Sequence, residues 1–217
     1  MKVVVLLSGG IDSSTLLAKL IWEKHEVNAL AFNYGQKHSK ELEHAKLIAD
    51  HYKVPLKVAD ISSIKELISK SSLTSDEPIP EGHYADESMK STVVPNRNMI
   101  MISLAAGYAW TIGASKVYFA AHSGDHPIYP DCRPDFVETL NNALLQGTDQ
   151  RVGVEAPFIN IDKTEIVSLG NKIGVPYELT WSCYVGGDKH CGRCGTCVER
   201  REAFEKAGVE DKTEYEG

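Results

Sequence analysis

Seven residues between an apolar run and a helical pattern carry the groups that phosphate binding requires. They are Ser8-Gly9-Gly10-Ile11-Asp12-Ser13-Ser14. Glycines let the backbone approach a ligand closely and adopt positive φ, serine hydroxyls donate hydrogen bonds, and the free N–H groups at a helix N-terminus bind anions. The string therefore predicts a phosphate site made of amides and hydroxyls.

Asp12 is the one residue of this string that would repel a phosphate. A divalent cation between the carboxylate and the phosphates removes the repulsion, so Asp12 predicts Mg²⁺ bound to pyrophosphate. The string lacks the Lys-Ser/Thr end of the common nucleotide loop and the Gly-x-Gly-x-x-Gly of dinucleotide-binding folds. The alternative is a plain strand–helix turn in which Asp12 or Ser13 is the helix N-cap.

The cysteines form a second group with its own chemistry. Four of the five lie within the last 35 residues, at Cys183, Cys191, Cys194 and Cys197. Four thiolates in two overlapping C-x-x-C turns fit a structural Zn²⁺, one per chain. An iron–sulfur cluster and redox-active thiols are the alternatives. Cys132 stands far away in sequence, and His190 beside Cys191 is interpreted as a solvated loop residue, so neither is expected to be a ligand.

The composition is that of an ordinary globular protein. The 217 residues include 23 Lys and Arg against 30 Asp and Glu, a net charge of −7, and 42% of the residues are hydrophobic. These values exclude disordered and collagen-like chains, and no apolar run approaches the ~20 residues that span a bilayer. The apolar run at residues 3–7 is too short for the core of a secretory signal, so we expect none. We expect a cytoplasmic protein that does not bind nucleic acid directly, because nucleic-acid-binding domains usually carry a basic face.

Hydrophobic periodicity predicts the elements that must position these groups. The expected strands are 3–7, 27–32, 54–59, 116–121 and 154–159, and the expected helices are 13–23, 36–52, 97–112, 134–146, 162–173 and 198–206. The alternation predicts an α/β fold with a parallel sheet and helices on both faces. Residues 60–92 are polar and are interpreted as a helix followed by a long loop. Loops of this length are often functional, so 71–92 is a candidate lid.

The first string, Ser-Gly-Gly-x-Asp-Ser, resembles the pyrophosphate loop of the PP-loop ATP pyrophosphatases. This resemblance implies an adenine nucleotide alpha hydrolase-like fold with five parallel strands in a doubly wound sheet. It also implies that ATP is cleaved between its α- and β-phosphates and that an oxygen of a second substrate is adenylated. Residues 1–180 would form the ATP-binding α/β domain, and 181–217 a zinc-binding segment with a short helix.

Three further strings resemble one branch of that family, the 7-cyano-7-deazaguanine synthases. They are Thr92-Val93-Val94-Pro95-Asn96-Arg97-Asn98, Asp125-x3-Tyr129-Pro130-Asp131-Cys132-Arg133-Pro134-Asp135-Phe136, and the cysteine string itself. A local departure is Ala120-Ala121-His122, where the family often has a glycine. The resemblance implies a ligase that converts 7-carboxy-7-deazaguanine, ammonia and ATP to the nitrile used in queuosine biosynthesis for tRNA modification. It also suggests a homodimer joined near the cysteines.

Six further residues are candidates for the reaction. Arg97 suits an anionic phosphate or acyl-adenylate because its guanidinium forms a fork; the alternative is an ion pair at a helix start. Lys163 resembles the family's second basic residue near the phosphates, or is a solvated first-turn lysine. The others are candidates for the base pocket: Asp125, Tyr129, Asp131 and Arg133. Asp131 could equally cap the next helix.

Two other functions stay open on sequence alone. One is a PP-loop enzyme that thiolates or amidates tRNA, although this needs a basic RNA-binding surface. The other is a non-catalytic nucleotide-binding module with a zinc knob for protein contacts. Elsewhere, Trp22 and Trp110 are expected in the core, and the run Glu199-Arg200-Arg201-Glu202 is expected on a solvated helical face.

Overall fold

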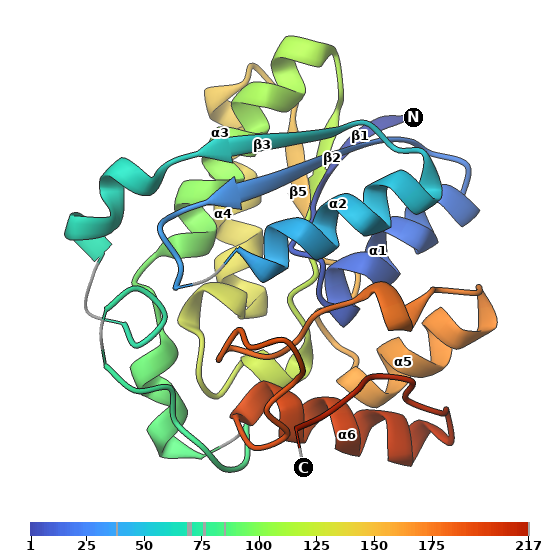
Figure 1. The fold of residues 1–217 in the computed structure, drawn as a ribbon. Helices are drawn as coiled ribbons and strands as arrows, with labels where there is room; N and C mark the ends of the chain where they lie inside the picture. The colour runs from blue at the N-terminus through green and yellow to red at the C-terminus, as the bar shows by residue number, and fades with distance from the viewer. Residues whose placement is uncertain (38, 69–70, 76, 85, 217) are drawn as a thin grey trace.

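Five parallel strands form a sheet in the order β3-β2-β1-β4-β5 (Figure 1). The computed structural model describes residues 1–37, 39–68, 71–75, 77–84 and 86–216. The strands are β1 (Lys2–Leu6), β2 (Glu26–Asn33), β3 (Leu56–Asp60), β4 (Lys116–Tyr118) and β5 (Gly153–Glu155). β1 lies at the centre because Val3, Val4 and Val5 have no polar side chain and are fully buried. The predicted parallel five-stranded sheet is confirmed.

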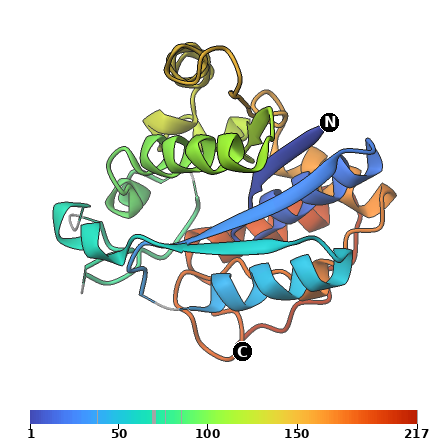
Figure 2. The same cartoon turned by 90° about the horizontal axis from the view of Figure 1, so that it is seen from above.

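Helices cover both faces of the sheet (Figure 2). They are α1 (Ile11–Trp22), α2 (Lys40–Tyr52), α3 (Arg97–Ile112), α4 (Pro134–Gly147), α5 (Lys163–Lys172) and α6 (Gly195–Ala207), and the short 3₁₀ helices are Ser62–Ile68, Glu87–Thr92, Ser123–Asp125, Pro130–Cys132 and Tyr177–Leu179. Within the described residues, no helix has the length and apolar character that crossing a membrane would require.

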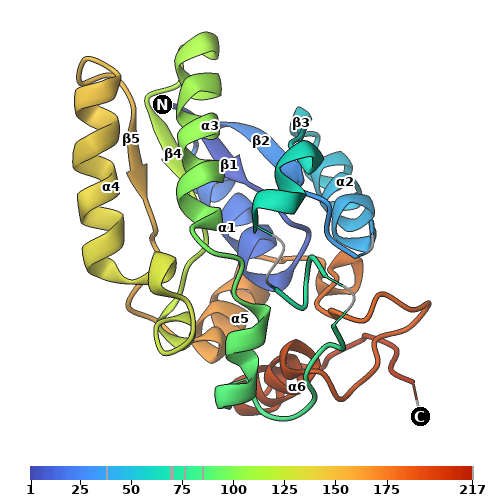
Figure 3. The same ribbon diagram turned by 90° about the vertical axis from the view of Figure 1, so that its left-hand side faces the viewer.

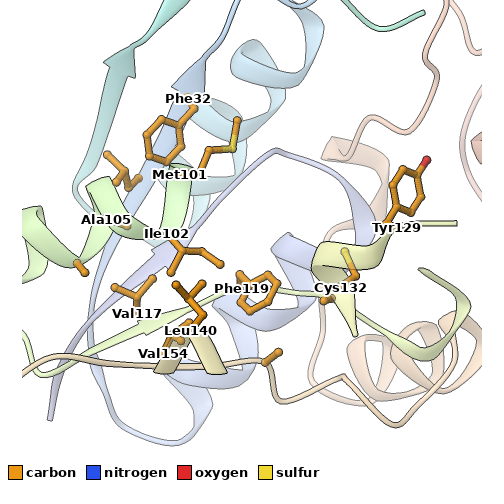
Figure 4. Packing of buried hydrophobic residues seen from close by; sticks show 14 of the residues in the cluster. Phe32, Met101, Ile102, Ala105, Val117, Phe119, Tyr129, Cys132, Leu140 and Val154 are labelled. Atoms are coloured by element: carbon orange, nitrogen blue, oxygen red, sulfur yellow. The ribbon is translucent and has the colours of Figure 1, made fainter. Parts of the chain in front are cut away.

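Alternate residues of β1 point into two separate apolar clusters. Val4 belongs to the cluster beneath α3 and α4, whereas Val3 and Val5 belong to the cluster with α1, α2, α5 and α6. Figure 4 shows the first cluster, where Ile102 of α3 and Leu140 of α4 pack over strands β4 and β5. Burial on both faces explains why β1 is continuously apolar rather than alternating.

Several boundaries differ from the predicted ones. β4 ends at Tyr118, before its predicted end, because 119–121 leave the sheet and line a cavity, and β5 also ends early, at Glu155. α6 begins at Gly195 instead of 198, since Cys194 is its N-cap residue and the cysteine turn forms the helix start. The predicted helix after 60 is the 3₁₀ helix Ser62–Ile68.

Two tryptophans expected in the core lie at the surface instead. The exposed fraction is 67% for Trp22 and 43% for Trp110. Trp110 contacts the Arg151 guanidinium, which lies 4.9 Å from its ring centroid. A helical stripe of apolar residues does not distinguish the edge of the buried face from its centre, which is why the prediction was wrong.

The last two helices lie side by side below the strands (Figure 3). α5 also packs against α1, the helix that follows the serine–glycine turn. The segment 71–92, apart from residues 76 and 85 outside the described part, is joined to the cysteine segment at two points. The Gly82 amide donates to the Arg193 carbonyl at 3.1 Å, and Arg193 Nε lies 2.7 Å from Glu81 Oε1.

Candidate functional site

The turn after β1 leaves the N-terminus of α1 without a side-chain cap. Gly10 is the N-cap residue, and no side chain caps the first amides of this helix within the described chain. Two serines bind each other instead: Ser8 Oγ lies 3.0 Å from Ser13 Oγ, which also accepts from the Ser8 amide at 3.2 Å. The helix end can therefore offer its amide hydrogens to an anion. Neither Asp12 nor Ser13 is the N-cap, contrary to the alternative considered above.

Gly9 and Ser14 are packed against the rest of the protein. Gly9 has φ of +81°, and a Cβ there would lie 2.5 Å from the backbone nitrogen of Ala45 in α2. Its carbonyl accepts from the Trp181 amide at 2.9 Å. Ser14 is fully buried, and its hydroxyl finds no hydrogen-bond partner among the described residues. Gly9 thus allows close packing of the turn against α2.

Asp12 lies in the first turn of α1, and its carboxylate contacts a lysine and a histidine that are distant in the sequence. Its Oδ2 is 3.3 Å from Lys163 Nζ and 3.9 Å from His122 Nε2. Its Oδ1 is buried and has no hydrogen-bond partner within the described part of the chain. A buried carboxylate oxygen without a donor is unfavourable unless another ligand reaches it. The carboxylate therefore has one oxygen held by the protein and one free.

Lys163 is the first residue of α5, and it is not a solvated lysine. Only 12% of its side chain is exposed, and it forms ion pairs with both Asp12 and Glu199. Burial alone would lower the pKa of Lys163, but the carboxylates of Asp12 and Glu199 outweigh it and hold that pKa above its ordinary value. The side chain therefore stays a cation at the cavity wall.

Asp125 is held by donors from two other segments. Tyr84 OH donates to Asp125 Oδ1 at 3.0 Å, and the His122 amide donates to Asp125 Oδ2 at 3.1 Å. Burial, with Asp125 beside it, raises the pKa of Tyr84 well above its ordinary value. His122 Nδ1 accepts from the Gly124 amide at 3.1 Å, so Nε2 carries the proton and faces Asp125 Oδ1 at 3.5 Å. The imidazole thus lies between two carboxylates, those of Asp12 and Asp125.

Arg97 begins α3 and points toward an aromatic wall. Its Nη1 donates to Tyr34 OH at 3.3 Å, with the guanidinium 5.5 Å from the Tyr34 ring centroid. Burial raises the pKa of Tyr34 to about 12, so the phenol stays neutral. Burial alone would lower the pKa of Arg97, but Tyr34, Tyr184 and Asp131 hold it above its ordinary value. Arg97 is therefore a permanent cation, and it lines a cavity.

These groups line one cavity of about 250 Å³. Nine predicted residues contribute to its wall, namely Ser8, Gly10, Ile11, Asp12, Ser13, Arg97, Asp125, Tyr129 and Lys163. The chain turns to opposite sides of the sheet after β1 and after β4, and both turns contribute to the cavity. It therefore lies at the topological switch point, where open parallel sheets bind ligands.

Asp131 and Arg133 are absent from the cavity wall as the described residues define it. Asp131 Oδ2 accepts from the Asn98 amide at 2.9 Å, at the start of α3. Arg133 Nε donates to the His126 carbonyl at 3.0 Å on the outside of the same loop. Both side chains hold the segment that contains Asp125 and Tyr129.

The four clustered cysteines converge on one point. Their Sγ atoms all lie within 4.8 Å of one another, and all four side chains are buried. Cys191 Sγ and Cys197 Sγ are 4.0 Å apart. Backbone amides donate to these sulfurs, as from Cys194 to Cys191 Sγ at 3.3 Å. Cys132 is not part of this group, as predicted, and lines the cavity instead.

The charge run that follows the cysteines is only half solvated, because Arg201 and Glu202 lie at the surface whereas Arg200 is buried and Glu199 is largely buried. Arg200 is fully buried, and its guanidinium binds Asp211, Thr180 and the Tyr177 carbonyl. Glu199 reaches Lys163. Arg200 follows Cys197 by three residues and so lies on the same buried helix face, a spacing that could have predicted its burial. No local pattern indicates the pairing of Glu199 with Lys163.

His190 was also expected in solvent, but it is buried. Only 3% of its surface is exposed. Its Nε2 accepts from the Ser182 amide at 3.0 Å, and its ring centroid lies 4.2 Å from that of Trp181. Burial and the nearby Arg200 lower its pKa to about 4. His190 packs the cysteine segment against the residues that cover the turn after β1.

Comparisons with known proteins find relatives over nearly the whole chain. A family model described as queuosine biosynthesis protein QueC matches residues 2–208. The 7-cyano-7-deazaguanine synthase of Pseudoalteromonas atlantica is 55% identical over 215 residues, 99% of this chain and 99% of that protein. The synthase of the same name from Archaeoglobus fulgidus is 56% identical over 212 residues, 97% of this chain and 89% of that protein.

Solved structures show the same fold at much lower identity. NMN synthetase from Francisella tularensis has a TM-score of 0.55 at 13% identity, covering 97% of this chain and 78% of that one. A 4-thiouridine synthetase, solved as an RNA complex with bound ATP, has a TM-score of 0.51 at 20% identity, covering 95% of this chain and 50% of that one. These neighbours support the adenine nucleotide alpha hydrolase-like fold.

Proposed function

The chain belongs to the QueC family of queuosine biosynthesis proteins, and from that premise we propose that it makes 7-cyano-7-deazaguanine from 7-carboxy-7-deazaguanine, ammonia and ATP. The observation that carries this proposal is one cavity in which an uncapped helix N-terminus, the buried cation Lys163 and the carboxylate of Asp125 meet. The enzyme is then a ligase that forms carbon–nitrogen bonds and releases AMP and pyrophosphate.

The turn after β1 is the proposed site of the pyrophosphate part of ATP. The amides at the start of α1 would donate to phosphate oxygens, with the hydroxyls of Ser8 and Ser13 beside them. Gly9 and Ser14 shape the turn, and Gly10 and Ile11 line the cavity. Oδ1 of Asp12 fits a Mg²⁺ ligand because it is buried and receives no hydrogen bond from the described residues. When bound, Mg²⁺ would neutralise charge between Asp12 and the phosphates.

A carboxylate must be activated before ammonia can attack it, because oxide is a poor leaving group. The substrate carboxylate oxygen attacks the α-phosphorus of ATP, and pyrophosphate leaves. Ammonia then attacks the acyl carbon, AMP leaves, and the amide forms with loss of a proton. Adenylation of the amide oxygen by a second ATP releases pyrophosphate again, and loss of AMP and of both amide protons gives the nitrile.

Two cations of this chain would stabilise the charge that develops in these steps. Lys163 lies beside Asp12 at the phosphate turn, where it can contact the leaving pyrophosphate. Arg97 lines the same cavity and can bind the phosphate of the adenylated intermediate through its fork. Fixed charges of this kind act strongly in a partly buried site because they need no reorganisation during the reaction.

The base pocket is proposed near Asp125 and Tyr129. Asp125 lines the cavity beside the Tyr84 and Tyr129 rings, whose centroids are 6.1 Å apart. A carboxylate can accept from the amino and imino groups of a guanine-like edge. We propose that Asp131 and Arg133 support the base pocket indirectly, because their hydrogen bonds hold the loop that carries Asp125 and Tyr129.

The four cysteines are proposed to hold one structural Zn²⁺. Thiolates around a single tetrahedral zinc, with Zn–S of about 2.3 Å, lie about 3.8 Å from one another. The observed spacing, with every sulfur within 4.8 Å of the others, fits that arrangement. An iron–sulfur cluster has its own sulfides and irons between the ligands, so the compact spacing favours a single ion. When bound, zinc would cross-link the start of α6 to the loop around Cys183.

A reconstituted assay tests the main proposal. The protein is mixed with ATP, Mg²⁺, an ammonium salt and 7-carboxy-7-deazaguanine, and the products are identified by mass spectrometry. We expect the nitrile together with two AMP per nitrile. Release of ADP would contradict the proposed chemistry, and ATP binding without turnover would indicate a nucleotide-binding module. The family match over nearly the whole chain favours the synthase over a tRNA-modifying enzyme. The proposed homodimer is tested separately by sedimentation velocity.

A further inference from the structure

Glu199 connects the cysteine centre to the phosphate turn. We propose that it is a positioning residue, which holds Lys163 at the phosphate site and thereby makes the metal-binding segment part of the catalytic structure. This inference rests on the proposed function, in which Lys163 contacts the leaving pyrophosphate.

The contact joins two helices that are both close to the cavity. Glu199 Oε2 accepts from Lys163 Nζ, and only 15% of the Glu199 side chain is exposed. Lys163 Nζ is 3.3 Å from Asp12 Oδ2, so the ammonium lies between two carboxylates. One belongs to α1 and the other to α6, with α5 between them.

The second carboxylate has a physical purpose that Asp12 cannot serve. A lysine side chain has a flexible chain of four carbons, so a single ion pair leaves its ammonium free to move. Asp12 is also the proposed metal ligand, and its charge is then shared with the cation. Glu199 pairs with Lys163 from another helix and would remain a partner for the ammonium when Asp12 binds the metal.

Glu199 is placed by the cysteine segment itself. It follows Cys197 by two residues in the first turns of α6, and Cys194 is the N-cap residue of that helix. Its neighbour Arg200 binds Thr180 Oγ1 at 2.8 Å and Ser182 Oγ at 3.2 Å.

Between those two residues, Trp181 donates its amide to the Gly9 carbonyl at 2.9 Å. Adjacent residues of α6 therefore fix two parts of the site, with Glu199 directed to Lys163 and Arg200 to the segment that binds the phosphate turn. The start of α6 thus acts as a common support for both.

The test compares Glu199→Gln with Glu202→Gln on the same helix. Glu202 is a matched control because its carboxylate pairs with Lys206 and His83 at the surface and does not line the cavity. We measure kcat and KM for ATP, zinc content, thermal unfolding and the crystal structure of each variant. In Glu199→Gln we expect kcat to fall at least tenfold, KM for ATP to change less than threefold, and zinc to stay at one per chain.

The crystal structures give an answer that does not depend on turnover. We expect Lys163 Nζ to leave the carboxylate of Asp12 in Glu199→Gln and to keep its place in Glu202→Gln. The inference is overturned if Lys163 keeps its place, if kcat stays within twofold of the wild type, or if activity falls only together with zinc content.

Failure of the wild type to form AMP would refute the proposed function, while the lysine position would still decide this inference. If Glu199→Gln does not fold, Glu199→Asp keeps the charge, shortens the side chain by one methylene and is measured in the same way.

Discussion

Lys163 Nζ lies 3.3 Å from Asp12 Oδ2, although the two residues lie in the first turns of different helices, α5 and α1. The pair puts a cation and a carboxylate at the mouth of the same phosphate turn. In a turn that bound only an anion, the carboxylate of Asp12 would repel the ligand. The arrangement is consistent with a site in which a metal-bound pyrophosphate leaves, because each charge then has a partner at each stage.

Replacement of Asp12 by alanine should remove AMP release and leave the fold intact. The carboxylate supplies the free oxygen at the cavity, so its loss should lower the rate at least about 100-fold. Product AMP is measured by chromatography and the fold by circular dichroism. Asp135→Ala is the control, since Asp135 also lies in a first helical turn but is exposed. AMP release at the wild-type rate in Asp12→Ala would remove Asp12 from the mechanism.

Arg97→Lys should lower kcat/KM by about tenfold to 100-fold although the charge is kept. A lysine ammonium cannot donate from two parallel positions as the guanidinium fork does. Tyr34→Phe removes only the hydroxyl that accepts from Arg97 and should change the rate much less. Steady-state kinetics with ATP as the varied substrate compare the two. Equal rates for Arg97→Lys and the wild type would show that charge alone matters at this position.

The strand–turn–helix geometry after β1 was predictable because its signals are local. Glycine at a positive φ, hydroxyls beside it and an apolar strand before it all occur within a few residues of one another. The clustered cysteines were predictable for the same reason, since their spacing alone brings four sulfurs into two adjacent turns. Both features require no knowledge of which distant segments lie nearby.

The partners of Asp12 were harder to predict. Lys163 and His122, which lie beside Asp12, and Glu199, which pairs with Lys163, come from three separate segments whose proximity depends on the sheet order. A run such as Glu199-Arg200-Arg201-Glu202 has the same pattern on a solvated helix as on one that buries two of its charges. Tertiary pairing decided its environment, because buried Arg200 and partly buried Glu199 each found an opposite charge.

Gly9→Ala should destabilise the protein more than Gly174→Ala. Both glycines have positive φ, +81° and +76°, so each substitution carries a backbone penalty of about 1 kcal/mol. Space is open around Gly174, whereas a Cβ at Gly9 would lie 2.5 Å from a backbone nitrogen of α2. Urea unfolding should show a loss of more than about 3 kcal/mol for Gly9→Ala. Similar losses for both variants would mean that α2 moves away freely.

Cys191→Ser should abolish zinc binding, and Cys132→Ser should leave one zinc per chain. Cys191 belongs to the sulfur cluster, while Cys132 lies at the cavity. A structural zinc contributes directly to folding, so Cys191→Ser should also lower the unfolding temperature. Elemental analysis and calorimetry measure the two effects. Full zinc content in Cys191→Ser would exclude this residue as a ligand, and iron in the wild type would replace the zinc assignment.

Asp211→Asn should destabilise the protein by about 3 kcal/mol at neutral pH, because it leaves the buried Arg200 without its charged partner. Arg200 is fully buried, with Nε 3.0 Å from Asp211 Oδ2. Burial alone would raise the pKa of Asp211, but hydrogen bonds from Arg200, together with its charge, hold that pKa below the ordinary 3.8. The carboxylate therefore contributes stability above its unfolded pKa and loses it as the pH falls through the lower folded pKa.

The pH dependence separates this ion pair from a simple packing effect. Urea unfolding at pH 7 and pH 5 should show the full difference between wild type and Asp211→Asn, because both values lie above the unfolded pKa of about 4. The difference should shrink below that value, since protonated Asp211 then resembles asparagine. Asp50→Asn, on the exposed side of α2, should show almost no difference at any pH. A gap between wild type and Asp211→Asn that stays constant down to pH 3 would show that the charge of Asp211 does not stabilise the fold.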